Sequence, residues 1–465
     1  MKHAGGFLLF ILLLGGCEQS SFLTPSDASA TAEAMESNHS YSNHSQTQAE
    51  SLQFWPQWRG PLATGEAPHA SPPLDWNETK NVRWKIPLPY RGHSSPVIWG
   101  NHIFLTGTIA QGDPLPVPEQ PPGAHNNVDP KRVLRFMVAC VDLKNGSLIW
   151  EKAVRSAQPH QSTHESSSWA SASPVTDGER VFAFFGSNGL YALDLNGSVL
   201  WEKDFGDMQV KHGHGEGASP ALFGNTLILN WDHEGDSFVV AIDKRTGNEQ
   251  WRKPRDEPTS WATPIIVEVD GNPQAIVSGT TALRGYDLHT GEVIWHCAGL
   301  SNNVVASPVF SDGILYAGSS YNIQSLLALD LKGAKGNLRK SRHALWTRQH
   351  RTPYVPSPLF YKKHLYFLRH YQAILTRVVG KTGEEPNGPV RLLGILNLYA
   401  SPVAADGRIY FTDQQGVTLV ISWNKAPEVL SLNRLNDSFN ASAALVGDSI
   451  ILRGENFLYR IAASE

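Results

Sequence analysis

One stretch of the chain, residues 217–251, constrains the fold most strongly, because much of the chain after Asn81 repeats its pattern. It reads GASPALFGNTLILNWDHEGDSFVVAIDKRTGNEQW. Short apolar runs alternate with turns that contain Gly, which predicts four short strands in about 35 residues. After Asn81, no window of about 11 to 18 residues carries a sustained helical apolar stripe. We therefore expect a repeat unit of an antiparallel all-β array.

The residue that opens this unit recurs along the chain as a Ser or Thr before Pro. The openings are Ser95, Ser173, Ser219, Thr263, Ser307, Ser357 and Ser401, with a degraded copy at Ser442. A closing Trp also recurs, at Trp150, Trp201, Trp251, Trp295 and Trp346. A period of about 40 to 50 residues with four strands per unit indicates a β-propeller. Eight openings predict eight four-stranded blades.

The two ends of the array complement each other. The unit that opens at Ser442 stops without a closing strand, whereas a strand around Trp84 precedes the first opening. Joining the two would remove the exposed edges that an open array leaves. We expect the strand around Trp84 to complete the last blade.

The first 51 residues differ in composition from the rest. In residues 1–17, Lys2 and an apolar run lead to Leu14-Gly15-Gly16-Cys17, which resembles the bacterial lipobox, whose Cys is acylated. The run is shorter than the roughly 20 residues of a membrane-spanning helix. We expect a lipoprotein signal peptide with lipidation at Cys17, and an ordinary cleaved signal is the alternative. Residues 18–51 are predicted to form a disordered Ser-rich tether, and residues 52–465 the propeller.

Charge and cysteine content narrow the function classes. The 39 basic and 43 acidic residues give a net charge of -4, which shows no footprint for nucleic-acid binding. We expect a monomeric ring.

Two cysteines lie within the propeller, Cys140 and Cys297, in strands of different blades. We therefore expect two buried free thiols. A disulfide between them is the alternative in an oxidising compartment.

The loops that join one blade to the next converge on one mouth of the propeller channel, which makes them the candidate binding site. Insertions at residues 109–131 and 156–168 enlarge the loops of the first blade, and long loops on a rigid ring commonly carry binding. The candidate ligand-binding residues are His164, Trp169, His212, His214, Glu216, Trp261, Asn303 and Tyr354.

The residues of these loops suggest two kinds of chemistry, metal binding and nucleophilic catalysis. His212, His214 and Glu216 alternate, so on an extended segment they would point to one side and could bind zinc or a similar ion; a hydrogen-bonded or solvated loop is the alternative. Ser166 near His164 could be drawn as a nucleophile and its base, but Ser and His are common residues. The chain has no Gly-x-Ser-x-Gly, Walker or Cys-x-x-Cys motif, and we predict no catalytic residue.

The repeat Ala-Leu-Asp-x-x-x-Gly-x-x-x-Trp, nearest to complete at residues 241–251, resembles the pyrroloquinoline-quinone-type (PQQ-like) propeller family over residues 84–461. That family implies one of two functions. Its quinoprotein dehydrogenases bind the quinone and calcium at the channel mouth. Its non-enzymatic lipoproteins include the scaffold subunit of the outer-membrane β-barrel assembly machinery. The arm at residues 55–61 is similar to the leader of propeller proteins from planctomycete-type bacteria.

The resemblance favours the non-enzymatic function. The dehydrogenases carry adjacent cysteines over the quinone, and this chain has no adjacent Cys pair. We expect a binding or scaffold propeller without a cofactor. It would be lipid-anchored, face the periplasm from the outer membrane, and present its mouth loops to a protein or small ligand. The alternative is an oxidoreductase that uses pyrroloquinoline quinone with calcium, or another enzyme of the channel mouth.

Overall fold

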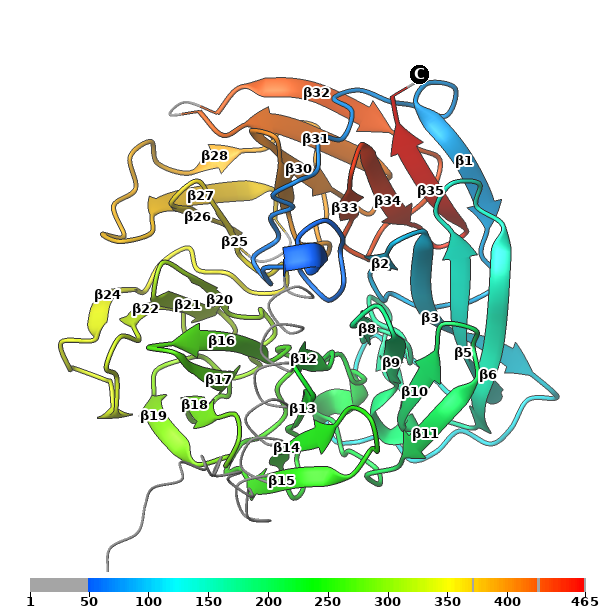
Figure 1. Ribbon diagram of the computed structural model, residues 1–465, viewed down its shortest axis with the longest axis horizontal. Coiled ribbons are helices and arrows are strands. Elements are labelled where there is room, and N and C mark those ends of the chain that lie inside the picture. Colours follow the sequence, from blue (N-terminus) through cyan, green and yellow to red (C-terminus); the bar gives the residue numbers. More distant parts are fainter. Residues whose placement is uncertain (1–48, 370–371, 425–426, 464–465) are drawn as a thin grey trace, which may run out of the picture. The chain divides into compact units, whose positions relative to one another are not determined.

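The computed structural model describes residues 49–369, 372–424 and 427–463. The expected signal peptide, Cys17 and nearly all of the expected tether therefore lie outside the described residues. Residues 49–465 form one compact unit. Its strands make eight antiparallel blades arranged as a ring (Figure 1), which confirms the predicted all-β, eight-bladed propeller.

The first four blades follow one another along the chain. Blade 1 contains β2 (Val97–Trp99), β3 (His102–Gln111), β5 (Val133–Asp142) and β6 (Leu148–Ala157). Blade 2 contains β8 (Val175–Thr176), β9 (Arg180–Phe184), β10 (Leu190–Asp194) and β11 (Val199–Lys203). Blade 3 contains β12 (Ala221–Phe223), β13 (Thr226–Trp231), β14 (Phe238–Asp243) and β15 (Glu249–Pro254). Blade 4 contains β16 (Ile265–Val269), β17 (Asn272–Val277), β18 (Leu283–Asp287) and β19 (Val293–Cys297).

The other four blades complete the ring. Blade 5 contains β20 (Val309–Ser311), β21 (Ile314–Ser319), β22 (Ser325–Asp330) and β24 (Ala344–Arg348). Blade 6 contains β25 (Leu359–Tyr361), β26 (His364–Leu368), β27 (Ile374–Val379) and β28 (Val390–Arg391). Blade 7 contains β29 (Val403–Ala405), β30 (Arg408–Thr412), β31 (Val417–Ser422) and β32 (Val429–Arg434). Blade 8 contains β33 (Ala444–Val446), β34 (Ser449–Arg453), β35 (Phe457–Ala462) and β1 (Val82–Pro87).

Blade 8 shows the predicted closure. Strand β1 pairs antiparallel with β35, with Trp84 opposite Arg460 and Ile86 opposite Leu458. The N-terminal part of the propeller thus supplies the outermost strand of the last blade, and the ring has no open end.

The opening Ser and Thr residues have a structural role in the ring. The backbone N–H of each opening residue donates to the side-chain oxygen of the next, in the order Ser95, Ser173, Ser219, Thr263, Ser307, Ser357, Ser401, Ser442 and back to Ser95, over 2.8 to 3.1 Å. All of these side chains are buried. This hydroxyl ring satisfies the N–H at the start of each innermost strand and connects every blade to its neighbour.

The closing Trp residues connect the blades at the outer radius. The indole N–H of Trp84, Trp150, Trp201 and Trp251 donates to a backbone carbonyl in the turn of the following blade. The ring also covers a Gly in that turn, as Trp201 covers Gly247. Trp295 differs, because its indole donates to Gln274 in its own blade. There, a fifth strand, β23 (Gly336–Asn337), pairs with the outer edge of blade 4.

The aromatic arm before β1 enters the channel. Trp55 pairs with Ile98 of blade 1, the indole of Trp58 donates to Ser307 Oγ of blade 5, and Arg59 donates to the carbonyls of Pro358 and Pro402. In Figure 1 the first described residues, drawn in blue, lie near the axis of the ring. The sequence predicted that this arm packs on the propeller; the structure places it against the innermost strands of several blades.

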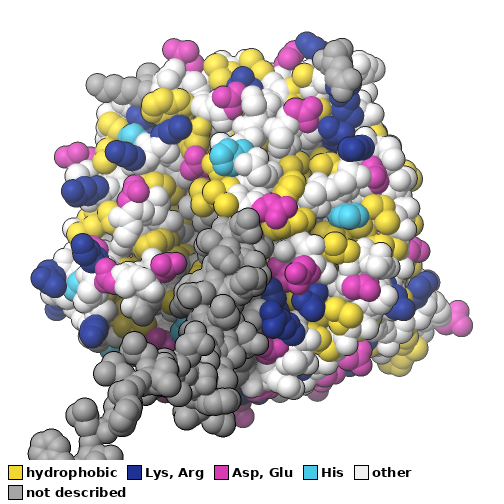
Figure 2. Space-filling view, viewed as in Figure 1, with side chains coloured by type: hydrophobic (Ala, Val, Ile, Leu, Met, Phe, Trp, Pro, Cys, Tyr) yellow, Lys and Arg dark blue, Asp and Glu magenta, His cyan; other side chains and the backbone are white. Residues whose placement is uncertain are grey.

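The thiols, the helices and the surface charges bear on expectations from the sequence. Cys140 and Cys297 are free and buried, as expected. In the described residues, no helix is long and apolar enough to cross a membrane. On the face shown in Figure 2, basic and acidic side chains are interspersed, in keeping with the small net charge of -4.

Candidate functional site at the channel mouth

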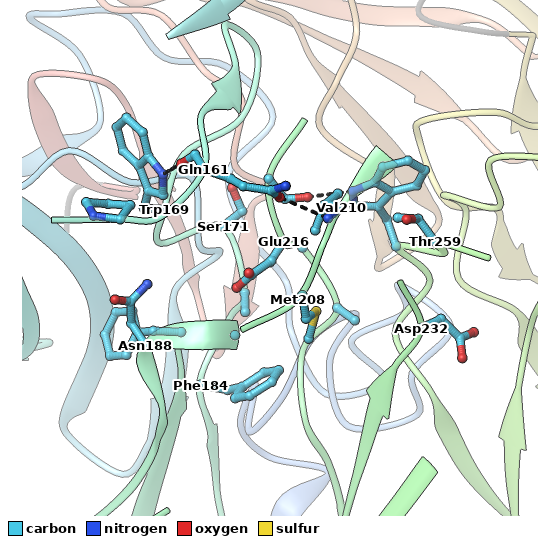
Figure 3. A pocket seen from close by; sticks show the side chains of 18 of the residues that line it. Gln161, Trp169, Ser171, Phe184, Asn188, Met208, Val210, Glu216, Asp232 and Thr259 are labelled. Carbon is cyan, nitrogen blue, oxygen red and sulfur yellow. Dashed lines mark hydrogen bonds between the residues drawn. The ribbon is translucent and has the colours of Figure 1, made fainter. Parts of the chain in front are cut away.

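The channel mouth is the end of the ring where each outermost strand leads to the innermost strand of the next blade. Between blades 2 and 3 these loops enclose a cavity of about 30 Å³. Trp169, Glu216 and Trp261, all candidate residues from the sequence, line it. Figure 3 shows Glu216 in the middle of the cavity, with Trp169 on one side and Thr259 on the other. The volume suffices for about two ordered water molecules.

The turn that connects β9 to β10 holds the side chain of Glu216. The backbone N–H of Ser187 donates to Oε2 of Glu216 at 2.7 Å, and the Ser187 hydroxyl donates to Oε1. Gly186 has a φ of 55°, and a Cβ there would lie 1.5 Å from Oε2. Only Gly therefore lets the carboxyl approach this turn. Burial raises the pKa of Glu216, whereas the hydrogen bonds from Ser187 lower it.

The two Trp residues fix the walls of the cavity. The indole N–H of Trp169 donates to the carbonyl of Gln161 at 3.0 Å. The indole N–H of Trp261 donates to the carbonyl of Gly215 at 2.7 Å. Trp169 thus closes the loop between blades 1 and 2 on itself. Trp261 joins the loop after blade 3 to the loop before it. The indole N–H groups donate to backbone carbonyls of the protein itself, so the rings offer only apolar surface to a ligand or partner.

The two insertions of blade 1 pair with each other above this region. Strand β4 (Asn127–Val128) of the first insertion is antiparallel to β7 (Thr163–His164) of the second. The amide of Asn127 donates to Ser162 Oγ at 2.7 Å and to the carbonyl of His212 at 2.8 Å. The insertions therefore join the loop that leads from blade 2 to blade 3.

Four imidazoles meet at this junction, and we call His125, His164, His212 and His214 the histidine cluster. The ring centroid of His214 lies 4.7 Å from that of His125, 4.8 Å from that of His164 and 5.4 Å from that of His212. Burial and the neighbouring imidazoles lower the pKa of His214 to about 4. Burial also lowers the pKa of His164. Both shifts favour the neutral ring, of His214 and of His164, at neutral pH.

The zinc site considered for His212, His214 and Glu216 is not assembled in the described residues. Residues 211–213 form a short 3₁₀ turn with His212 at φ 58°, so the expectation of an extended segment was wrong. His212 and His214 still meet, but Ser187 binds the carboxylate of Glu216. Throughout the described ranges, no group of three His, Cys, Asp or Glu side chains is arranged to hold a metal ion.

The acidic residues of the neighbouring loop are also engaged within the protein. Asp232 forms a buried ion pair with Arg255 at 2.7 Å and accepts a hydrogen bond from Ser260. Glu234 accepts hydrogen bonds from the backbone and hydroxyl of Thr259. These carboxylates hold the loops of blade 3 in place.

The proposed nucleophile and base are in contact, but as part of a turn. His164 Nδ1 lies 2.7 Å from Ser166 Oγ. The backbone N–H of Ser166 donates to the same nitrogen at 3.1 Å. This pattern is typical of a side chain that caps its own loop, and the expectation of no catalytic residue stays a prediction.

The remaining candidates lie elsewhere at the mouth. Asn303 is buried between blades 4 and 5 with φ 55°, next to Val304, whose carbonyl accepts from the backbone of Trp261. Tyr354 stacks on Tyr321, with ring centroids 6.2 Å apart. Neither lines the cavity of Trp169 and Trp261. The candidate residues therefore fall into three places: a cavity, the histidine cluster and the loops of blades 4 to 6.

Sequence reasoning missed two residues that shape these places, His125 and Ser187. His125 lies in an insertion that the repeat spacing identified, but the pairing of the two insertions brings it to His214. Ser187 lies in a turn inside blade 2. The spacing of the repeats gave no signal for either contact.

The comparisons with known proteins agree with this architecture. The model of the family described as outer membrane protein assembly factor BamB matches residues 74–204 and 235–464. Among solved structures, BamB from Moraxella catarrhalis has a TM-score of 0.51 at 13% identity, over 78% of this chain and 97% of that chain. A europium-containing methanol dehydrogenase has a TM-score of 0.59 at 11% identity, over 89% of each chain. The comparison with curated proteins gave no match.

At these identities the two structural neighbours show the shared propeller fold alone. The family model is the stronger finding, since its two matched segments cover well over half of the chain and include strands of every blade. The chain belongs to the PQQ-like propeller family described as outer membrane protein assembly factor BamB.

Proposed function

We propose that the protein is a non-enzymatic scaffold of the cell envelope that binds a protein partner through its channel-mouth loops. The match to the family of an outer membrane assembly factor carries this proposal. The lipobox-like Leu14-Gly15-Gly16-Cys17 supports a lipid anchor at Cys17, with the propeller facing the periplasm from the outer membrane.

Exposed apolar side chains on the mouth side of blades 5 to 7 support a protein partner. Tyr321 and Ile323 are 49% and 51% exposed, and Leu393 and Leu396 are 71% and 62% exposed. Beside them, Gly394 faces the exposed Leu432, since a Cβ on Gly394 would lie 3.1 Å from it. Apolar side chains gathered on loops of one face are typical of interaction sites. We call Tyr321, Ile323, Leu393 and Leu396 the apolar mouth surface; Leu432, in the outermost strand β32, adjoins it at Gly394.

The quinone-dependent oxidoreductase is the second candidate, because the fold is also that of a methanol dehydrogenase. Pyrroloquinoline quinone and calcium need a broad cavity and free carboxylates. The cavity here is about 30 Å³, and Glu216 and Asp232 are engaged by Ser187 and Arg255. With both carboxylates engaged, neither is free to bind a calcium ion, which favours the scaffold.

Site-specific photocrosslinking in the full-length, membrane-bound protein tests the proposal. A photoreactive residue at Ile323 or Leu393 should give one discrete crosslinked product. The matched control is Arg245, an exposed residue in a turn at the opposite end of the ring, which should give none. A product from Arg245 equal to that from Leu393 would contradict a mouth-specific partner.

A calorimetric titration with pyrroloquinoline quinone and calcium separates the two candidates. We expect no heat of binding from the folded protein. Binding near one-to-one that is lost in Trp261→Ala would support the oxidoreductase instead. Fractionation of a Cys17→Ser variant tests the anchor, because this variant should leave the membrane fraction.

A further inference from the structure

The first insertion of blade 1 lies over the mouth but contributes almost nothing to the core. From Gln111 to Asp129, every residue is exposed or only half-buried. It is held by a few polar contacts, among them the hydrogen bonds of Asn127 and one from the backbone of Glu165 to the carbonyl of Asn126 at 2.8 Å. Segments with few buried apolar contacts open at low cost in free energy.

The histidine cluster is the one titratable part of this attachment. His125 comes from the first insertion, His164 from the second, and His212 and His214 from the loop between blades 2 and 3. The rings of His125 and His212 are 5.4 Å apart. The imidazole rings thus join the same three segments that the hydrogen bonds of Asn127 connect.

Neutral and charged imidazoles behave oppositely in such a contact. Neutral rings pack edge to face, as His125 and His214 do with planes 76° apart. Charged rings at this spacing repel one another, and burial of His214 adds to the penalty. Charged groups on the same segments act in both directions. Glu165 favours the protonated form of His164, Lys211 precedes His212 and adds positive charge, and Asp129 pairs with Lys131 at 3.4 Å.

We propose that the histidine cluster is a pH-sensitive latch, which holds the first insertion over the channel mouth at neutral pH and releases it on acidification. Release separates β4 from β7 and uncovers Ser162 and the loop at His212. It leaves the blades intact, because the hydroxyl ring and the Trp contacts contain no group that titrates in this range. The mouth would then present a different surface to a partner in an acidified compartment.

The direction follows from the pKa of His214, which is lowered to about 4 in the closed form. A released His214 would titrate near its ordinary value of about 6.5. The closed form is therefore fully favoured above pH 6.5 and loses its advantage as the pH falls toward 4. Taken in full, this shift would lower the closed-to-open ratio roughly 40-fold between pH 6.5 and 4.5. The ring of His214 is only half-buried, so screening by solvent reduces the expected fall to about tenfold.

Hydrogen exchange of the full-length protein tests the latch. The measured quantity is the protection factor of the peptide containing Glu165, whose backbone N–H bonds to Asn126 only in the closed form. Protection factors correct for the intrinsic pH dependence of exchange. We expect the protection of this peptide to fall about tenfold more than that of the blade strands between pH 6.5 and 4.5.

Two variants and a control make the test specific. His214→Gln should remove the pH dependence at Glu165, and His125→Gln should reduce it, because His125 is one of the three imidazoles that lower the pKa of His214. Because His125 is exposed, its replacement keeps the test valid should His214→Gln fail to fold. His364→Gln, at the start of β26 in blade 6, should behave as the wild type. Three results would overturn the latch. They are constant protection of the Glu165 peptide across the pH range, a fall in His125→Gln equal to that in the wild type, and a fall in all blades as large as that at Glu165.

Discussion

Ser442 and Ser95 are 347 residues apart in the chain, yet the backbone N–H of Ser442 donates to Ser95 Oγ at 3.0 Å. This bond closes the hydroxyl ring at the junction of the first and last blades. The sequence identified Ser442 as a degraded opening because no Pro follows it. The structure shows that the hydroxyl, not the Pro, is what every opening shares.

The first prediction concerns this junction. In Ser95→Ala the buried N–H of Ser442 loses its acceptor, which costs about 1 to 3 kcal/mol. We expect the urea midpoint of unfolding to fall accordingly. Thr263→Ser is the control, because it keeps the hydroxyl that accepts from Ser219. An unchanged midpoint in Ser95→Ala would mean that water replaces the lost acceptor.

The second prediction compares two Gly residues in turns. Gly247 has φ 74° and lies under Trp201, so a Cβ would be 2.8 Å from the indole. Gly313 has φ 79° with open space around the same position. Both changes to Ala cost about 1 to 2 kcal/mol of backbone strain. Gly247→Ala should cost about 1 to 2 kcal/mol more, since Trp201 must move. Equal losses of stability would show that the indole contact adjusts freely.

The third prediction concerns the arm in the channel. The Arg59 side chain is 2% exposed and donates to the carbonyls of Pro358, Pro402 and Thr64. Arg59→Ala leaves these carbonyls without donors and opens a cavity, so we expect a loss of about 3 kcal/mol in the free energy of unfolding.

Trp58→Phe provides the matched comparison for Arg59. It removes the hydrogen bond to Ser307 Oγ and part of a half-buried ring, so a loss of about 1 to 2 kcal/mol is expected. If Arg59→Ala were as mild as Trp58→Phe, the arm would not contribute to the stability of blades 6 and 7.

The fourth prediction concerns the thiols. Burial raises the pKa of Cys140 to about 12, and burial also raises the pKa of Cys297. Both should resist an aromatic disulfide reagent at pH 8 in the folded propeller and react fully in denaturant. Fast reaction of either thiol in the folded protein would show that its strand opens locally.

The sequence predicted the repeating parts of the fold because each repeat has to pair and bury its strands in the same way. The Ser openings, the Trp closings and the shared blade at Trp84 all follow from spacing. It did not predict the path of the arm at Arg59 or the exception at Trp295, because each occurs once. The candidate residues lie at the mouth where the blade-to-blade loops converge, and that they form a binding site stays a prediction. The contact of His125 with His214 depends on how two insertions pair, which spacing does not encode.

The last prediction concerns His93 beside the channel axis. Burial and the nearby Arg453 lower the pKa of His93 to about 4. Its Nδ1 lies 3.1 Å from the carbonyl of Ser166, and its Nε2 lies 3.4 Å from the amide of Asn440. Because the folded pKa lies below the ordinary value of about 6.5, the neutral ring stabilises the fold fully above pH 6.5, and this stability is lost as the pH falls toward 4.

The variant His93→Gln isolates this effect, because every other titrating group remains. Each pKa unit corresponds to about 1.4 kcal/mol, and partial exposure of the ring reduces the total. Between pH 7 and 4.5, the wild type should therefore lose roughly 2 kcal/mol more stability than His93→Gln. Urea unfolding of both proteins at several pH values measures the difference. Parallel curves would show that His93 becomes protonated in the folded ring without cost, through rearrangement of the loop at Ser166.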